Sequence, residues 1–234
     1  MPSAEVTPKA AGSLTETLWR EIEGPYRAIL EHPFILGLSD GDLAEEAFRF
    51  YVVQDAHFLR AFARTLGVIA ARSPEEGDIA MFSEHAAGAL EVERSLHESF
   101  FVDFGLREEE VAATPVAPTN LAYTSYLLAT AYGGSFGEAL GAVLPCYWIY
   151  WEVGKHLLER GSSNPLYQRW IDTYGGEDYA AMVEAVLGLA DRLGPELGSA
   201  EREKMKRHVR VASRYEWMFW DMAHRRERWP LDAE

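Results

Sequence analysis

Residues 144–155 read Leu-Pro-Cys-Tyr-Trp-Ile-Tyr-Trp-Glu-Val-Gly-Lys, and they lie within a longer segment, 136–158, that we predict to be one helix. Apolar residues recur through this segment every three or four positions, close to the helical period of about 3.6 residues. They are Phe136, Leu140, Val143, Tyr147, Trp151 and Leu157. A long helix with so apolar a centre indicates a helical protein organised around it.

Pro145 lies inside this predicted helix. It removes one backbone N–H and crowds the carbonyl group four residues earlier, at Gly141, so we expect a kink just before Cys146. Cys146 is the only cysteine of the chain, and Tyr150, one helical turn later, shares its face. A thiol and a phenol beside a local distortion indicate a functional site. The alternative is that Cys146 is a small apolar filler, which is the common role of a buried free cysteine.

The bulk composition excludes several classes of protein. The 234 residues suffice for one large domain, and the formal charge of −15 argues against nucleic-acid binding, because phosphate contacts need clustered Lys and Arg. A single cysteine excludes an internal disulfide framework. No apolar run approaches the ~18 residues that span a bilayer, and residues 1–13 do not resemble a signal peptide. We therefore expect a soluble cytoplasmic protein that binds neither nucleic acid nor membranes.

Turn signals divide the rest of the chain into further helices, and no segment alternates as a strand would. We expect an all-α, single-domain helical bundle of roughly seven main helices. The domain is predicted over 14–224, between a disordered tail, 1–13, and a polar tail, 225–234. The predicted helices cover residues 14–31, 34–38, 43–72, 74–104, 108–111, 118–132, 136–158, 166–174, 178–193 and 199–224.

Three polar segments are predicted to cap helices. Ser13 with Glu16 has the pattern of a capping box. Residues 39–42 read Ser-Asp-Gly-Asp and predict a turn that caps the next helix. Ser199 is predicted to cap the last long helix.

Two carboxylates interrupt apolar stripes. Asp55 lies among aromatic residues at helical spacing, and Glu216 interrupts the stripe of the last helix. An acid in apolar surroundings has a raised pKa, which makes it a possible proton donor near neutral pH. The structural alternatives are that Asp55 pairs with a buried arginine or a helix end, and that Glu216 reaches solvent at the edge of its stripe.

Phenols and possible metal ligands complete the candidates. Tyr123, Tyr150 and Tyr174 could order a flat polar ligand, although each alone is commonly a core tyrosine. A di-iron bundle would need Glu-x-x-His on two helices. The Glu93–His97 and Glu152–His156 pairs are instead spaced by four, so we expect no metal site.

Four segments resemble the TenA (thiaminase II) family, and the resemblance extends from about residue 18 to 223. They occur in the family's order, and their joint presence is specific. The segments are Tyr-Val-Val-Gln-Asp-Ala-His-Phe at 51–58, Asn-Leu-Ala-Tyr-Thr-Ser-Tyr at 120–126, Leu-Pro-Cys-Tyr-Trp-Ile-Tyr-Trp-Glu-Val-Gly at 144–154 and Ser-Arg-Tyr-Glu-Trp-Met-Phe-Trp at 213–220.

This resemblance implies a haem-oxygenase-like fold, a homotetramer without cofactor or metal, and a role in thiamin salvage. The implied reaction is hydrolysis at the methylene carbon of a 4-amino-2-methylpyrimidine, in thiamin or in its aminomethyl pyrimidine breakdown product. By the same resemblance Cys146 is the nucleophile, Glu216 protonates the leaving group and Asp55 binds the pyrimidine. The implied pocket residues are Tyr51, Phe58, Tyr123, Tyr150 and Tyr174.

One position departs from the family pattern. Many members carry a tyrosine, thought to assist the thiol, at the position of Phe58. We expect the difference to affect the rate rather than the reaction. Two other functions remain open at this stage: a non-catalytic pyrimidine-binding or regulatory protein, and a helical metal oxidase on the same scaffold.

Overall fold

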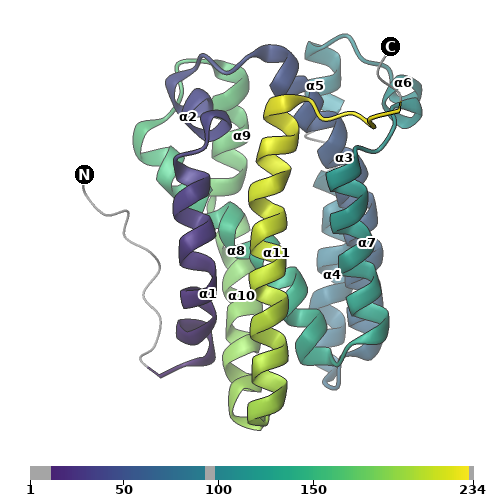
Figure 1. Ribbon diagram of the computed structural model, residues 1–234, viewed down its shortest axis with the longest axis vertical. Helices are drawn as coiled ribbons and strands as arrows, with labels where there is room; N and C mark the ends of the chain where they lie inside the picture. The colour runs from purple at the N-terminus through teal and green to yellow at the C-terminus, as the bar shows by residue number, and fades with distance from the viewer. Residues whose placement is uncertain (1–11, 93–97, 232–234) are drawn as a thin grey trace. The chain divides into compact units, whose positions relative to one another are not determined.

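The computed structural model describes residues 12–92 and 98–231, and all regular secondary structure in these residues is helical (Figure 1). Seven helices of this described part have 16 residues or more, which confirms the all-α prediction. The α-helices are α1 Leu14–Leu30, α2 Pro33–Asp40, α3 Glu45–Arg72, α4 Glu76–Val92, α5 Glu98–Asp103, α6 Glu108–Ala113, α7 Pro118–Gly133, α8 Phe136–Arg160, α9 Pro165–Gly175, α10 Glu177–Leu193 and α11 Ser199–Arg225, with a 3₁₀ turn at Gly194–Glu196.

Two compact units make up the chain. The first unit comprises the described part of Met1–Asp42 together with Gly137–Trp217, and the second comprises Leu43–Phe136 and the described part of Met218–Glu234. The chain crosses between them before α3, at the start of α8 and within α11. No helix in the described ranges is both long enough and apolar enough to cross a membrane.

α8 is buried on all sides rather than along one stripe. Every residue from Gly137 to Gly154 is buried, including Glu138 and Glu152. The predicted helix of residues 136–158 is therefore confirmed, but its apolar stripe understates its burial. A helix with apolar residues all around is expected in the interior of a domain.

Glycines let two neighbouring helices approach the backbone of α8 within the first unit. A Cβ at Gly141 would lie 2.7 Å from the carbonyl oxygen of Met205 on α11, and one at Gly154 would lie 2.6 Å from that of Tyr174 on α9. Both distances are too short for a side chain. The order of small residues along α8 therefore sets how closely α9 and α11 pack against it.

Ion pairs join α11 to α1 and α8 within the first unit. Arg210 lies 2.8 Å and Lys206 3.4 Å from carboxylate oxygens of Glu21 on α1. Glu138 of α8 lies 3.3 Å from His208. Burial is the main cause that lowers the pKa of His208, and Glu138 opposes this shift. The basic stretch of residues 202–210 therefore contacts acidic groups of its own unit.

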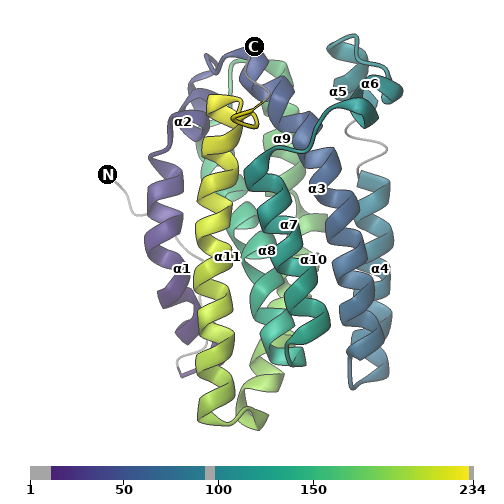
Figure 2. The same ribbon diagram turned by 45° about the vertical axis from the view of Figure 1, so that its right-hand side comes forward.

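The second unit is built on α3, which packs against α4 and α7 (Figure 2). Gln54 of α3 fastens the connector that precedes α7. Its side chain accepts a hydrogen bond from the Ala117 N–H at 2.9 Å and donates one to the Pro115 carbonyl at 3.0 Å. Asn120 donates to the carbonyl oxygen of Gln54 at 2.8 Å. These bonds hold the start of α7 against α3.

Several predicted element boundaries were wrong. The single helical turn expected at 34–38 is the longer, eight-residue helix α2, which includes Ser39 and Asp40. The residue before α3 is Ala44, whose side chain makes no cap, so the 39–42 cap does not form. A left-handed Gly41, with φ of 80°, ends α2 instead. The local reason is that glycine reaches this conformation without the Cβ clash that other residues meet.

The other caps were predicted in part. Ser13 accepts a hydrogen bond from the Glu16 N–H at 3.1 Å, but the carboxylate of Glu16 binds the Gly12 N–H instead of closing the box. Ser199 is the first residue of α11, and the Gly198 carbonyl accepts the first helical bonds.

α8 runs through Pro145 as a single helix. Within the helix expected at 74–104, residues 93–97 lie outside the described residues, as do 1–11 of the predicted N-terminal tail and 232–234 of the C-terminal tail.

We predict that Gly141→Ala lowers the stability of the protein. The new methyl group would meet the Met205 carbonyl, and such overpacking typically costs about 1–3 kcal/mol in the free energy of unfolding. Gly188→Ala in α10 is the matched control, because the nearest side-chain atom to its Cβ would be at 3.9 Å. That substitution should stabilise by about 0.5–1 kcal/mol through helix propensity. Denaturant unfolding of both variants measures the difference, and equal effects would refute the close-contact argument.

Candidate functional site

The structure buries all eight residues that the sequence analysis selected. Cys146 is 8% exposed, Glu216 1% and Asp55 3%. Four of the eight belong to the first unit and four to the second. The first-unit group contains Cys146, Tyr150, Tyr174 and Glu216, and the second-unit group contains Tyr51, Asp55, Phe58 and Tyr123.

An aromatic cluster forms near Cys146 in the first unit. Tyr150, one turn after the cysteine, lies with its ring centroid 5.1 Å from that of Tyr174. Tyr174 lies 4.6 Å from Trp170 on its own helix, α9. The close approach of α9 to Gly154 brings Tyr174 to this position. Two of the three phenols selected from the sequence therefore lie side by side.

Tyr179 joins the same cluster and was missed in the sequence analysis. Its ring stands edge-on to Tyr174 at 5.3 Å, and its hydroxyl oxygen lies 3.4 Å from the carbonyl oxygens of both Cys146 and Tyr147. Burial is the main cause that raises the pKa of Tyr179 well above its usual value, followed by the charge of Cys146. Tyr179 lies in the first turn of α10, just after the Gly175-Gly176 break. No local sequence pattern distinguishes it as a site residue.

Glu216 belongs to the same electrostatic environment. Its carboxylate is among the groups that raise the pKa of Tyr179, as are Tyr174 and Tyr147. Glu216 is almost fully buried, so the alternative that it reaches solvent at the edge of its stripe is wrong. The first unit therefore gathers a thiol, a carboxylic acid and several phenols within electrostatic reach of one hydroxyl.

The second-unit group combines Asp55 with three aromatic residues. Asp55 lies on α3 between Tyr51 and Phe58, one turn from each. The Phe58 ring lies 5.3 Å from that of Tyr123 on α7. A buried carboxylate among aromatic rings can bind the donor edge of a flat heterocycle while the rings contact its faces.

Phe219 is a second residue that the sequence analysis missed as a site candidate. Its ring lies 5.4 Å from Phe58 and 5.9 Å from Tyr51, so it completes the aromatic wall of the second unit. The available signal was its place three residues after Glu216 on α11.

The first-unit and second-unit groups of residues offer different chemistry. The first contains a thiol and a carboxylic acid, groups of the kinds that can supply the nucleophile and the proton in a displacement with a poor leaving group. The second contains a buried carboxylate and aromatic surfaces. In the part of the chain that the structure describes, no three His, Cys, Asp or Glu side chains are arranged to hold a metal ion.

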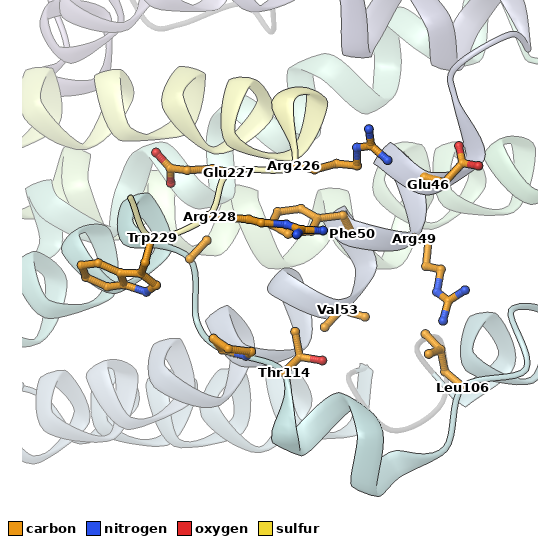
Figure 3. Close-up of a pocket in the computed structure, with 12 residues that line it drawn as sticks. Glu46, Arg49, Phe50, Val53, Leu106, Thr114, Arg226, Glu227, Arg228 and Trp229 are labelled. Carbon is orange, nitrogen blue, oxygen red and sulfur yellow. The ribbon is translucent and has the colours of Figure 1, made fainter. Parts of the chain in front are cut away.

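A separate groove of about 520 Å³ lies in the second unit (Figure 3). None of the eight selected residues lines it. Its walls include Phe50 and Trp229, and charged groups of both signs surround them. The C-terminal segment is fixed there, because Trp229 donates to the Val116 carbonyl at 3.0 Å and Glu227 accepts from the Thr119 N–H at 2.8 Å. This groove is a consequence of how the C-terminal segment folds back.

Comparison with known proteins gives a consistent set of relatives. The sequence profile of the TENA/THI-4/PQQC family matches residues 19–226. The aminopyrimidine aminohydrolase of Bacillus subtilis is 39% identical over 202 residues, which cover 86% of each chain. That of Halalkalibacterium halodurans is 32% identical, over 93% of this chain and 98% of its own.

Solved structures agree on the fold. A TenA family transcription regulator from Silicibacter sp. TM1040 is 32% identical with a TM-score of 0.84, over 91% of this chain and 97% of its own. A domain of unknown function from Shewanella denitrificans, described as having a haem-oxygenase-like fold, superposes with a TM-score of 0.73 at 15% identity, over 93% and 94% of the chains. The fold of the present chain is therefore haem-oxygenase-like, as the resemblance implied.

Proposed function

Because the chain belongs to the TENA/THI-4/PQQC family, we propose that it is an aminopyrimidine aminohydrolase of thiamin salvage. Its substrates are 4-amino-2-methylpyrimidines, either the aminomethyl pyrimidine or thiamin, and its product is the hydroxymethyl pyrimidine. The observation that carries this proposal is the 39% identity to the Bacillus subtilis enzyme over most of both chains. The buried thiol, acid and carboxylate described above support it.

The proposed reaction assigns one role to each polar group. The carboxylate of Asp55 accepts hydrogen bonds from the aminopyrimidine edge and orients the ring. The thiolate of Cys146 adds to the electron-poor ring, and the electrons then expel the group on the methylene carbon. Glu216 gives its proton to the departing amine, which leaves poorly as an anion. Water then adds at the methylene carbon and gives one proton to the Glu216 carboxylate, and the thiolate leaves the ring. For the aminomethyl pyrimidine the net reaction therefore consumes one water and releases one ammonia.

The ring residues have supporting roles in this proposal. In this proposal Tyr51, Phe58, Tyr123, Tyr150 and Tyr174 are the aromatic residues that contact the pyrimidine. Phe58 has no hydroxyl group with which to assist the thiol. We expect this difference to affect the rate of the step at Cys146 rather than the reaction. The reaction as proposed requires no metal or organic cofactor.

A regulatory protein is the second candidate, since the similar Silicibacter structure is titled a transcription regulator. The net charge of −15 argues against direct contact with DNA. We also propose that the enzyme is a homotetramer, as the family resemblance implies, and that it is cytoplasmic, as expected from the composition of the sequence. Light scattering of the purified protein would measure its mass, and fractionation of cells would locate it.

The decisive experiment is a product assay by chromatography with both substrates. We expect the parent protein to form the hydroxymethyl pyrimidine. Cys146→Ser should lose nearly all turnover while still binding the pyrimidine, because a serine hydroxyl is far less acidic than a thiol. A variant within about tenfold of the parent, which is a barrier change of only ~1.4 kcal/mol, would exclude Cys146 as the nucleophile. No product from either substrate with the parent would exclude the proposed function.

Asp55→Asn should weaken binding of the hydroxymethyl pyrimidine. An amide has fewer acceptor sites than a carboxylate and lacks its charge, and a hydrogen bond to a charged group is typically worth about 1.5–3 kcal/mol. Isothermal titration calorimetry should therefore show a loss of roughly tenfold to a hundredfold in affinity. Unchanged affinity in a variant with the parent's circular dichroism spectrum would contradict the recognition role.

Glu216→Gln should discriminate between leaving groups. Ammonia needs a proton to leave, whereas the thiazole of thiamin leaves as a neutral molecule from a cation. General acid assistance is worth ~10²–10⁴-fold, so kcat/KM for the aminomethyl pyrimidine should fall by roughly that factor and kcat/KM for thiamin by less. Equal losses for the two substrates would show that Glu216 binds or supports rather than donates a proton.

A further inference from the structure

We propose that Tyr179 is a positioning residue for Cys146, and that its hydroxyl group holds the turn of α8 that carries the thiol. The inference deepens the proposed function and rests on it, since it concerns the residue proposed as the nucleophile. Tyr179 does not touch the sulfur in this proposal. It acts through the backbone on which the sulfur is mounted.

The first argument is geometric. The hydroxyl oxygen of Tyr179 lies 3.4 Å from the carbonyl oxygens of both Cys146 and Tyr147, so one O–H group is shared between two acceptors. Each contact is long, but the pair places the hydroxyl directly over the peptide groups beside the cysteine. The Tyr174 ring, edge-on at 5.3 Å, limits the movement of the Tyr179 ring away from them.

The second argument concerns what α8 lacks at this point. Pro145 has no N–H, so the carbonyl of Gly141 loses its usual helical partner in the turn just before the cysteine. A helix with a missing bond is more easily deformed there. A hydrogen-bond donor from α10 at the next two residues restrains the helix from outside where its own hydrogen bonding is interrupted.

The third argument is that the hydroxyl remains a donor under working conditions. Burial and the nearby charges of Cys146 and Glu216 raise its pKa, so the phenol stays protonated. Its proton is directed at carbonyl oxygens beside the sulfur and offsets part of their negative potential. Without it, the thiolate faces more of that potential, so the pKa of the Cys146 thiol should rise.

The single cysteine of the chain allows a direct test. The rate of alkylation of the native protein by iodoacetamide, measured against pH, reports the pKa of Cys146 alone. In Tyr179→Phe the midpoint of this profile should rise by about 0.4–1 pH unit, the equivalent of one hydrogen bond. We expect kcat to fall by roughly threefold to tenfold for the same reason. KM should stay within about twofold, because the pyrimidine is recognised elsewhere.

Tyr26→Phe is the matched control. The Tyr26 hydroxyl is buried in the same unit and also lies 3.4 Å from a carbonyl oxygen of α8, that of Glu152, away from the cysteine. This variant should retain the parent's alkylation midpoint and kcat. Far-UV circular dichroism and thermal melting of both variants establish that they are folded.

Two outcomes would overturn the proposal. One is an alkylation midpoint in Tyr179→Phe equal to that of the parent, whatever happens to stability. The other is an equal shift in Tyr26→Phe, which would mean that any loosening of α8 has the same effect. The alkylation measurement uses no substrate, so it tests Tyr179 even if the parent proves to have no hydrolase activity, and the two failures can be told apart.

Discussion

The close backbone contacts of α8 are the constraint on which the first unit depends. Gly141 and Gly154 allow the backbones of α11 and α9 to lie against the helix, and its centre is sealed from solvent as a result. Any charge in this helix must then have a partner. Glu152 accordingly accepts a hydrogen bond from Trp148 Nε1 at 3.2 Å and pairs with Lys155 at 2.8 Å. The close packing that the two glycines allow therefore also explains why a charged residue at the centre of α8 needs a partner.

The fold was largely predictable because helical spacing and breaking residues are local properties. The predicted helix of residues 136–158 ends only two residues before the observed α8, and Pro118 opens α7 as expected. Periodicity found only one face of α8, because it measures the contrast between faces and a fully buried helix has little contrast. The cap expected at residues 39–42 does not form because α2 continues through Ser39 and Asp40. A short polar motif does not determine where the preceding helix ends.

The candidate site residues could be selected from the sequence for a different reason. Cys146, Asp55 and Glu216 are chemically unusual in apolar surroundings, so each could be selected without knowing its neighbours, and the family resemblance then suggested roles. Tyr179 and Phe219 have no such local distinction. Their importance comes from residues that are distant in sequence, such as the carbonyl group of Cys146 or the ring of Phe58. A single sequence contains no information on those pairings beyond general apolarity.

The solitary thiol also determines how the protein responds to oxidants. A cysteine oxidised to sulfenic acid is commonly rescued when a second thiol of the same chain condenses with it to a disulfide. That route within one chain needs a second cysteine, and Cys146 is the only cysteine in the sequence. Repair must therefore come from an external thiol such as glutathione, which has to reach a sulfur in a residue that is only 8% exposed. The burial that slows the first oxidation of Cys146 also slows its reversal, so damage to this thiol tends to persist once it has occurred.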